Sequence, residues 1–257
     1  MISKPSIVLA CADGDSTRAI ASALEKRFGP ISVVMENPVS KWQMIKRRAK
    51  KLGVVTTGGQ VIFIAFLVPL LRYLGRNRIS KLESEFDLQK SLPANVINVD
   101  SINSEQSIDA FRKLKPDVVV ISGTRIISKN VLSAIDAPFI NMHAGITPSY
   151  RGVHGAYWAL FEGKPELVGT TVHLVDPGID TGGIIEQAFF EVDNSDSFAT
   201  YPYLHTASGI PALIRAVESA LNGALQTKPH QPGLVSELRY HPTIWQYVQG
   251  RLMKGVR

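Results

Sequence analysis

Residues 6–35 read SIVLACADGDSTRAIASALEKRFGPISVVM, and this stretch decides the fold. The apolar run 6–10 predicts a strand, Asp13-Gly14-Asp15-Ser16 predicts a turn, and 17–28 has apolar residues at helical spacing behind Ser16, the expected N-cap. A second short strand is expected over 31–35. A strand, a helix and a strand in this order favour a parallel sheet covered by helices.

The same alternation resumes beyond residue 92. Strands are expected at 96–99, 118–122, 138–142, 170–175 and 184–190, and helices at 107–114, 128–135, 156–162 and 201–221. Pro211 should kink or divide the last of these helices. The sequence therefore predicts an α/β fold, a Rossmann-like open and mostly parallel sheet with helices on both faces. We expect a catalytic domain over 1–195 with a helical insertion at 38–92, and a C-terminal helix and tail over 196–257 packed on or near the core.

Composition places the chain among proteins with a large core and no disulfide. The 257 residues are 45% hydrophobic and include one cysteine, Cys11, within an apolar run that predicts a buried thiol. The N-terminus is polar, and the apolar run after it is too short for a signal peptide, so a cytoplasmic location is expected. The net charge of +6 is modest but clustered.

The insertion joins a basic half to an apolar half. Six Lys or Arg residues crowd 41–51, and Thr56-Thr57-Gly58-Gly59 leads into the almost wholly apolar run 61–71. Eleven residues are too few to cross a bilayer, which needs about 20, so a buried or lid helix is expected. The alternative is a peripheral membrane contact through 41–72, with the basic cluster beside anionic headgroups. The cluster itself either attracts phosphates or is a solvated helix face.

Polar residues gather where the expected strands end. Asn141-Met142-His143 closes an apolar strand, and alternation places residues 141 and 143 on one side. A loop rich in Gly and Pro follows over 144–152, and Asp180 stands in a turn between two later strands. Ligands of open α/β sheets bind at the carboxyl ends of strands, so these groups should face a crevice.

The order of motifs N-x-H, P-x-x-x-G, G-T-T-V-H and D-x-G-x-I-I resembles the folate-dependent formyltransferase family. The resemblance is strong from Pro116 to Gln187, weaker over 6–28, and absent from 38–92 and after 195. It implies the formyltransferase fold and 10-formyltetrahydrofolate as the formyl donor.

The same resemblance assigns residues to roles. Asn141, His143 and Asp180 stand where the family keeps its catalytic residues. The residues that resemble the two loops around the pteridine ring are Gly123, Thr124, Arg125, Ile126 and Ile127 in one loop, and Val175, Asp176, Gly178, Ile179 and Gly182 in the other. Residues 169–173 resemble the strand behind the second loop.

Formyl transfer to an amine needs the groups that these three side chains supply. The tetrahedral intermediate carries an oxyanion, which the Asn141 amide and a protonated or proton-sharing His143 could stabilise. Asp180 could accept the amine proton directly or through water, and could raise the histidine pKa by proximity.

The acceptor side is less determined. Gly145 and Thr147 replace the serine and leucine usual in the family, and two carboxylates, Asp13 and Asp15, should repel a phosphate, which argues against phosphoribosylglycinamide as acceptor. Candidate acceptor contacts are Gly14, Ser16, Gly145, Arg151 and His154, the last of which could instead be simply exposed. His173, within a strand, is expected to be structural. No H-x-x-x-H or C-x-x-C spacing is present, so no metal site is expected.

The leading hypothesis is an N-formyltransferase acting on a small-molecule primary amine, an amino sugar presented as a sugar nucleotide. About 60 residues follow the last core strand, which leaves little room for an RNA-binding barrel domain, so no nucleic-acid partner is expected. The alternatives are a 10-formyltetrahydrofolate hydrolase, a phosphoribosylglycinamide formyltransferase, and a folate- or membrane-surface-binding protein without turnover. A dimer through the C-terminal helix and tail is conceivable.

Overall fold

The computed structural model describes residues 4–229 and 233–257. Its main sheet has seven strands in the order β3-β2-β1-β4-β5-β7-β8. The strands are β1 (Ile7–Cys11), β2 (Ser32–Glu36), β3 (Val96–Val99), β4 (Val118–Ser122), β5 (Phe139–His143), β7 (Gly169–Leu174) and β8 (Ile184–Phe189). The first five strands in the sheet order pair in parallel, whereas β7 pairs antiparallel with both of its neighbours, β5 and β8. The expected fold class is confirmed.

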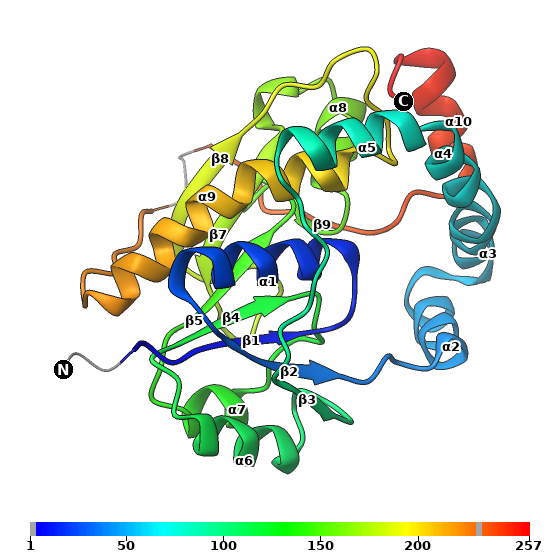
Figure 1. Ribbon diagram of the computed structural model, residues 1–257. Coiled ribbons are helices and arrows are strands. Elements are labelled where there is room, and N and C mark those ends of the chain that lie inside the picture. The colour runs from blue at the N-terminus through cyan, green and yellow to red at the C-terminus, as the bar shows by residue number, and fades with distance from the viewer. Residues whose placement is uncertain (1–3, 230–232) are drawn as a thin grey trace.

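Helices cover both faces of this sheet (Figure 1). On one face α1 (Asp15–Phe28) and α9 (Tyr201–Leu221) bury residues such as Leu24 and Leu213 against β1 and β4. On the other face α6 (Glu105–Leu114) and α7 (Lys129–Ala134) bury residues such as Phe111 and Val131. Residues of β1 alternate between the two cores, which is why its sequence is a continuous apolar run.

The order in which the chain adds strands to the sheet changes direction between the neighbouring strands β1 and β4. The chain runs from β1 outward to β2 and β3, then returns to β4 on the other side of β1 and continues to β5. The loops after β1 and β4 therefore diverge and leave a crevice at the carboxyl ends of these strands.

The remaining elements lie around these layers. A two-stranded pair joins β6 (Arg151–Gly152) to β9 (Leu238–Arg239), so the C-terminal region supports the loop after β5. The other helices are α8 (Gly155–Phe161), the 3-10 turn η2 (Pro165–Leu167) and α10 (Ile244–Met253).

One local expectation was wrong. Gly14, not Ser16, precedes the first residue of α1, and Ser16 lies within the helix. Pro211 does not divide α9, which runs undivided over 21 residues. Buried residues on both sides of Pro211, including Leu204, Leu213 and Val217, fix this helix against the core through tertiary packing. Cys11 is fully buried as expected, and burial raises the pKa of its thiol to about 12.

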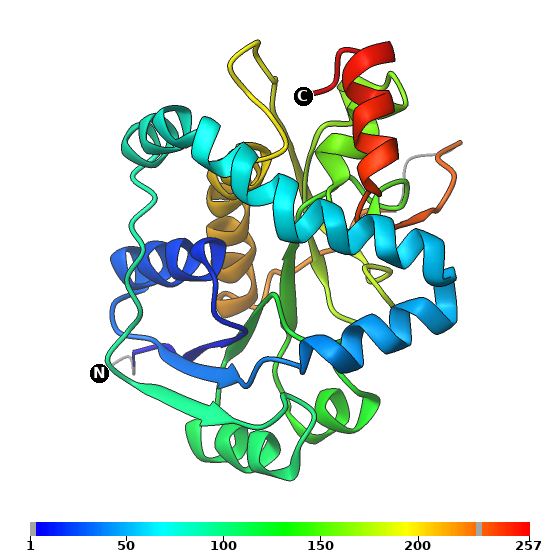
Figure 2. The ribbon, with the colours of Figure 1, turned by 90° about the vertical axis from the view of Figure 1, so that its right-hand side faces the viewer.

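The insertion also differs from its expectation. It forms α2 (Lys41–Leu52), α3 (Val54–Ile62), the π-helical turn η1 (Phe63–Leu67), α4 (Val68–Leu74) and α5 (Arg76–Glu85), which lie together on one side of the molecule (Figure 2). The stretch Val54–Leu74 is one helical rod of 21 residues, long and apolar enough to cross a membrane by length and composition. The eleven-residue estimate failed because Thr56 to Gly59 lie inside α3 rather than in a turn.

The rod is not a buried helix either. Only 22% of its most apolar 18-residue stretch is buried, although Val68 and Arg72 of α4 do line a cavity. Its contact with the rest of the protein depends on Gly59, where a Cβ atom would lie 2.2 Å from the ring of Trp245. A glycine at this position lets the helix approach α10 closely.

Candidate active site

Three polar side chains from two segments converge at the end of β5. Asn141 and His143 project from the same side of this strand, and Asp180 comes from the loop between β7 and β8. Oδ2 of Asp180 lies 3.3 Å from Nδ1 of His143, and His143 is buried. Within the expected trio, the His143 and Asp180 side chains are therefore close enough for a proton to pass between them.

A fourth side chain, His173, joins this cluster. It stands opposite Asn141 in the β5–β7 register. Its Nδ1 donates to the Leu174 carbonyl at 2.6 Å, so its Nε2 accepts from the Asn141 amide at 3.1 Å. Nε2 also lies 3.7 Å from Oδ1 of Asp180. His173 thus orients the Asn141 amide. Strand periodicity could not predict this role, because the antiparallel register of β5 and β7 decides which residue lies opposite Asn141.

The tautomer of His143 follows from its other nitrogen. Nε2 lies 2.7 Å from the Tyr150 carbonyl and must donate to it, which leaves Nδ1 as the lone pair facing Asp180 when the ring is neutral. Burial lowers the pKa of His143, against the opposing effect of Asp180. The pair Nδ1 and Oδ2 is therefore a site that can receive a proton.

Asp180 is kept ionised by its surroundings. Burial alone would raise the pKa of this carboxyl group, but His173, His143 and the backbone N–H of Gly152 together hold it below its ordinary value. The Gly152 N–H donates to Oδ2 at 2.8 Å. Asp180 also has a positive φ of 51°, a left-handed backbone conformation that few residues other than glycine adopt. The loop therefore presents this carboxylate from an uncommon backbone conformation.

The loop after β5 holds these groups through Gly145 and Arg151, whereas its Ala144 and Gly152 line the cavities described below. A Cβ atom on Gly145 would lie 2.3 Å from the Tyr150 carbonyl and 2.9 Å from Nε2 of His143, so glycine is required there. Arg151 donates to the Ile179 carbonyl at 3.1 Å and ties the two loops together. The structure therefore places Gly145 and Arg151, expected as acceptor contacts, in the wall of neither cavity described below.

A cavity of about 410 Å³ opens beside the cluster. Asn141, His143, His173 and Asp180 form one side of it. The rest of the wall includes the residues expected around the pteridine ring, namely Gly123, Thr124, Arg125, Ile126, Ile127, Val175, Asp176, Gly178 and Ile179, together with Ile121, Met142, Ala144, Gly152 and Val153. Gly182 does not line it. A Cβ atom on Gly182 would lie 1.8 Å from the Leu174 carbonyl, so this glycine allows the loop to close against β7.

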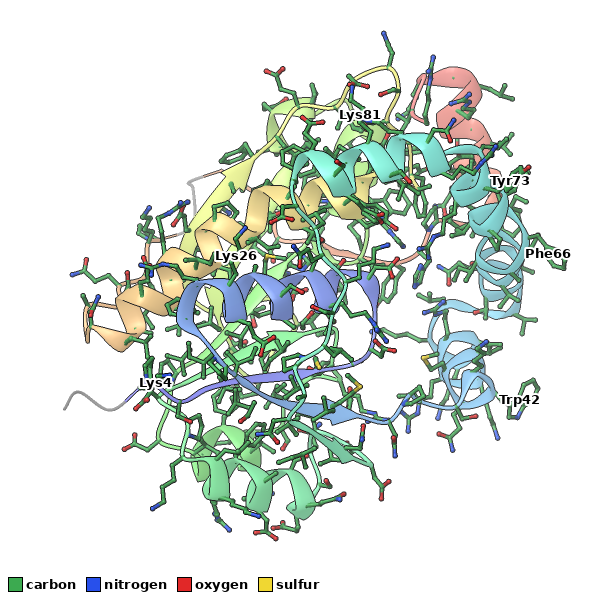
Figure 3. All side chains as sticks on the ribbon, in the orientation of Figure 1. Lys4, Lys26, Trp42, Phe66, Tyr73 and Lys81 are labelled. Carbon is green, nitrogen blue, oxygen red and sulfur yellow. The ribbon has the colours of Figure 1, made fainter. Side chains whose placement is uncertain are left out.

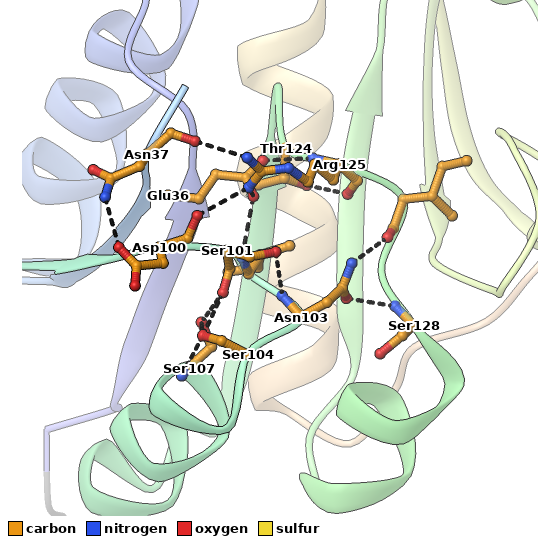
Figure 4. Close-up of polar contacts among 12 residues, drawn as sticks. Glu36, Asn37, Asp100, Ser101, Asn103, Ser104, Ser107, Thr124, Arg125 and Ser128 are labelled. Atoms are coloured by element: carbon orange, nitrogen blue, oxygen red, sulfur yellow. Dashed lines mark hydrogen bonds and ion pairs between the residues drawn. The ribbon is translucent and has the colours of Figure 1, made fainter. Parts of the chain in front are cut away.

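The loop after β4 is anchored from outside the cavity (Figure 4). The buried carboxylate of Glu36 accepts from the backbone N–H of Arg125 at 2.6 Å and pairs with its guanidinium group. Asn103 donates to the Ile126 carbonyl at 2.8 Å and accepts from the Ser128 N–H at 2.7 Å. Because the Arg125 side chain is engaged with Glu36, the loop offers the cavity mainly backbone and apolar groups.

A second cavity of about 600 Å³ adjoins the first. The two cavities share Gly123, Met142 and Ala144, and the last two of these flank His143. Gly14, Ser16 and His154, expected as acceptor contacts, lie in its wall. The cluster lines the first cavity, and the residues on either side of His143 in sequence also line the second, an arrangement suited to transfer between two molecules.

The acids at the second cavity have cationic partners. Asp13 pairs with Arg18 at 2.9 Å, and Asp15 pairs with Arg72 at 2.8 Å and lies 3.6 Å from Lys90. These cations offset the repulsion that the two carboxylates alone would exert on a phosphate. The sequence showed the acids but not the cations, since Arg72 and Lys90 come from distant segments.

His154 is not a freely exposed side chain. It is half-buried, its Nε2 lies 2.8 Å from Nδ1 of His241, and its ring packs 4.5 Å from the ring of Phe198. Burial and the neighbouring His241 hold the pKa of His154 well below its usual value. Burial and Arg48 lower the pKa of His241 to about 4. At neutral pH this pair is uncharged and adds hydrogen-bonding capacity to the second cavity.

The arrangement matches acyl-group transfer to an amine. Asn141 keeps one amide N–H that His173 does not use, and it faces the first cavity. The His143–Asp180 pair can take a proton from an attacking group. Within residues 4–229 and 233–257, no cluster of three or more His, Cys, Asp or Glu residues could hold a metal ion.

A family model described as Formyl transferase matches residues 77–217. The methionyl-tRNA formyltransferase of Thermodesulfovibrio yellowstonii is 23% identical over 193 residues, which cover 75% of this chain and 60% of that protein. Another methionyl-tRNA formyltransferase, from Finegoldia magna, is 35% identical over 104 residues, covering 40% of this chain and 33% of that protein. The chain thus spans between a third and three fifths of these relatives.

Solved structures share the fold at low identity. A sugar N-formyltransferase from a Shewanella species has a TM-score of 0.56 at 15% identity, covering 91% of this chain and 76% of that chain. WlaRD, described as a sugar 3N-formyl transferase in the presence of dTDP and 5-N-formyl-THF, has a TM-score of 0.53 at 16% identity, covering 92% and 70%.

Proposed function

Because this chain belongs to the formyl transferase family, whose model matches more than half of it, we propose that it transfers a formyl group from 10-formyltetrahydrofolate to the primary amine of an amino sugar. The observation that carries the proposal is the cluster of Asn141, His143 and Asp180 in the wall of the smaller cavity, next to residues that this cavity shares with the larger one. The smaller cavity takes the pteridine end of the donor, and the larger cavity takes the acceptor.

The residues supply each requirement of the reaction. The acceptor nitrogen attacks the formyl carbon, a C–N bond forms, and negative charge develops on the formyl oxygen. The amide N–H of Asn141 that remains free donates to this oxygen. The amine proton passes to the pair formed by Nδ1 of His143 and Oδ2 of Asp180. When the bond to N10 breaks, the same pair returns a proton to the departing nitrogen.

The second cavity supports a polar acceptor with a charged handle. Asp15, Arg72, Lys90 and Tyr203 form a connected group of charges and a phenol in its wall. Arg72 and Lys90 suit a diphosphate, and Asp15 suits an amine or sugar hydroxyls. The two solved structures described above are sugar N-formyltransferases, one of them described with dTDP, which favours a sugar nucleotide as the acceptor.

A second candidate acceptor is methionyl-tRNA. The curated relatives are methionyl-tRNA formyltransferases, and they match this chain at up to 35% identity over part of their length. This candidate shares the donor and the chemistry, and differs only in what the second cavity receives.

The test is a direct assay. Purified protein is incubated with 10-formyltetrahydrofolate and with UDP- and dTDP-linked amino sugars, phosphoribosylglycinamide or methionyl-tRNA, and tetrahydrofolate release and product mass are measured. Release that requires a sugar nucleotide and gives a product heavier by one formyl group supports the proposal. Formylation of methionyl-tRNA alone would replace the acceptor, and release without any amine would indicate a hydrolase. Donor binding with no release under any condition would indicate a binding protein.

A further inference from the structure

The rod Val54–Leu74 presents a row of large apolar side chains to solvent. Phe66 is 74% exposed, and Figure 3 shows Trp42, Phe66 and Tyr73 projecting to the same side, away from the sheet. We call the exposed apolar residues of α2 and the rod the apolar face. Its members are Trp42, Met44, Val54, Val55, Ile62, Ile64, Phe66, Leu70, Tyr73 and Leu74. Soluble monomers rarely expose contiguous apolar surface of this kind without an interaction partner.

The rod is apolar on its solvent side as well as on its inner side, unlike an ordinary surface helix. Its inner side buries Thr57 and Gln60, and the Gln60 amide donates to the His241 carbonyl at 2.7 Å. Phe63 fixes the same side by packing 4.9 Å from Phe198 and 5.3 Å from Tyr247. An amphipathic surface helix normally turns its apolar side inward. Here Leu67, Val68 and Leu71 also pack inward, yet the solvent side is apolar too, so folding of this chain alone does not account for the sequence.

This attachment also decides how the rod could meet a membrane. One side is packed against α10 through Gly59 and Trp245 along part of its length. A rod crossing a bilayer would carry that attached polar surface into the hydrocarbon, where unsatisfied polar groups are costly. The rod can instead lie in the plane of the membrane surface, with only its outward side immersed.

The segment that carries the apolar face has charged residues of one sign only. Residues 37–82 contain ten Lys or Arg residues and no Asp or Glu, whereas the whole chain has a net charge of only +6. The rest of the chain is therefore net negative. In α2 no residue is buried, and its lysines, including Lys46 and Lys50, are exposed beside Trp42. Basic side chains next to exposed aromatic and aliphatic ones match a surface of anionic headgroups above acyl chains.

The end of α10 adds to the same surface. Leu252 and Met253 are largely exposed, Trp245 is half-exposed where it packs on α3, and residues 243–257 contain Arg251, Lys254 and Arg257 but no acid. Two segments far apart in sequence therefore share one composition, apolar and basic without acids.

We propose that α2, the rod Val54–Leu74 and the exposed side of α10 dock on the surface of an anionic lipid bilayer. The rod lies parallel to the surface, Phe66, Leu70 and Tyr73 enter the interface, and the lysines of α2 contact lipid phosphates. Val68 and Arg72 of the same rod line the second cavity, so docking holds that cavity close to the lipid surface. This inference does not depend on the proposed reaction.

Vesicle sedimentation tests the proposal. The full chain is mixed with vesicles of phosphatidylcholine alone and of phosphatidylcholine with phosphatidylglycerol, and the bound fraction is measured. Binding should be much stronger to the vesicles with phosphatidylglycerol and should weaken as salt rises. The double variant Phe66→Ser/Leu70→Ser should bind them at least about tenfold more weakly, since each residue loses apolar area that the interface would bury.

Matched variants separate the apolar and charged contributions. Phe189→Ser changes an exposed phenylalanine on β8 and should leave binding unchanged. Lys46→Glu/Lys50→Glu should weaken binding to phosphatidylglycerol vesicles by about tenfold or more. Lys113→Glu/Lys129→Glu, which changes two exposed lysines on α6 and α7, should have little effect. Each variant should have the same melting temperature as the wild-type chain, which checks that its fold is intact.

Two results would overturn the proposal. One is equal, weak sedimentation with both vesicle types by the wild-type chain. The other is a dimer in lipid-free solution, detected by light scattering, that Phe66→Ser/Leu70→Ser dissociates while vesicle binding is absent. In that case a second copy of the chain, rather than a lipid surface, covers the apolar face.

Discussion

The two adjoining cavities near His143 are lined by residues from different parts of the chain. All residues of the smaller cavity lie between Ile121 and Asp180, inside the part of the chain that the family model matches. The larger cavity also draws on residues 12–20, Val68 and Arg72, which lie outside that part. The smaller one is walled by loops whose charged side chains are engaged elsewhere, whereas the larger one presents charged side chains directly.

This difference separates chemistry from specificity. A space lined by anchored loops suits one invariant ligand, since its shape does not depend on side chains from the insertion. A space lined by ion pairs from α1, α4 and the segment before β3 can change its ligand by exchanging a few residues. We therefore expect substitutions at the cluster to abolish turnover with every acceptor, and substitutions at the larger cavity to affect only acceptor recognition.

The largest effect is expected from His143→Ala. Removing Nδ1 leaves Asp180 without its proton-sharing partner, and the rate of tetrahydrofolate release should fall by about 10²–10⁴-fold. Donor affinity, measured by quenching of protein fluorescence, should change far less. Lys113→Ala, at an exposed position of α6 that lines neither cavity, serves as the control. If His143→Ala kept near-normal turnover, the boundary between the cavities would not be the reacting centre.

Asn141→Ala should have the next largest effect. The variant loses the only side-chain amide placed to donate to the oxyanion, so kcat should fall by about 10²–10³-fold. KM for the donor should rise much less, because the same cavity wall remains. Asn98→Ala, at an exposed position of β3, is the matched control. A rise in KM with unchanged kcat would instead assign Asn141 to ground-state binding.

Arg72→Ala should sharpen the contrast between the two cavities. Loss of the guanidinium group removes a partner of Asp15 and a contact for an anionic acceptor, and KM for a sugar nucleotide should rise roughly 3–10-fold. Donor affinity and the rate at saturating acceptor should stay close to wild type. Equal losses for donor and acceptor would show that the cavities are not independent.

The smallest effect concerns pH. The pKa values of His143 and Asp180 are both lowered, so the neutral imidazole and the carboxylate persist through the neutral range. The kcat profile should be flat at and above the ordinary histidine pKa of about 6.5 and should fall only on the acid side of it. In Asp180→Asn the effect that raises the His143 pKa is lost, so the remaining activity should extend to lower pH. An acid limb centred at or above 6.5 would contradict the burial of His143.

The sequence by itself determined the sheet class and the positions of Asn141, His143 and Asp180. Apolar runs, turn residues and alternation are local properties, and the strand-end position of the Asn–His pair follows from them. The residues around the smaller cavity also came from contiguous motifs, so all except Gly182 were found where they were expected.

Only the tertiary structure decided the rest, because the partners concerned are distant in sequence. His173 reaches Asn141 through strand register, and Asp15 is paired by Arg72, which stands 57 residues further along the chain. The rod reaches 21 residues because Thr56 to Gly59 continue α3 instead of forming a turn, with Gly59 packed against the distant Trp245. Periodicity states which residues share a face of a helix, but only packing shows whether that face is turned toward the core or toward solvent.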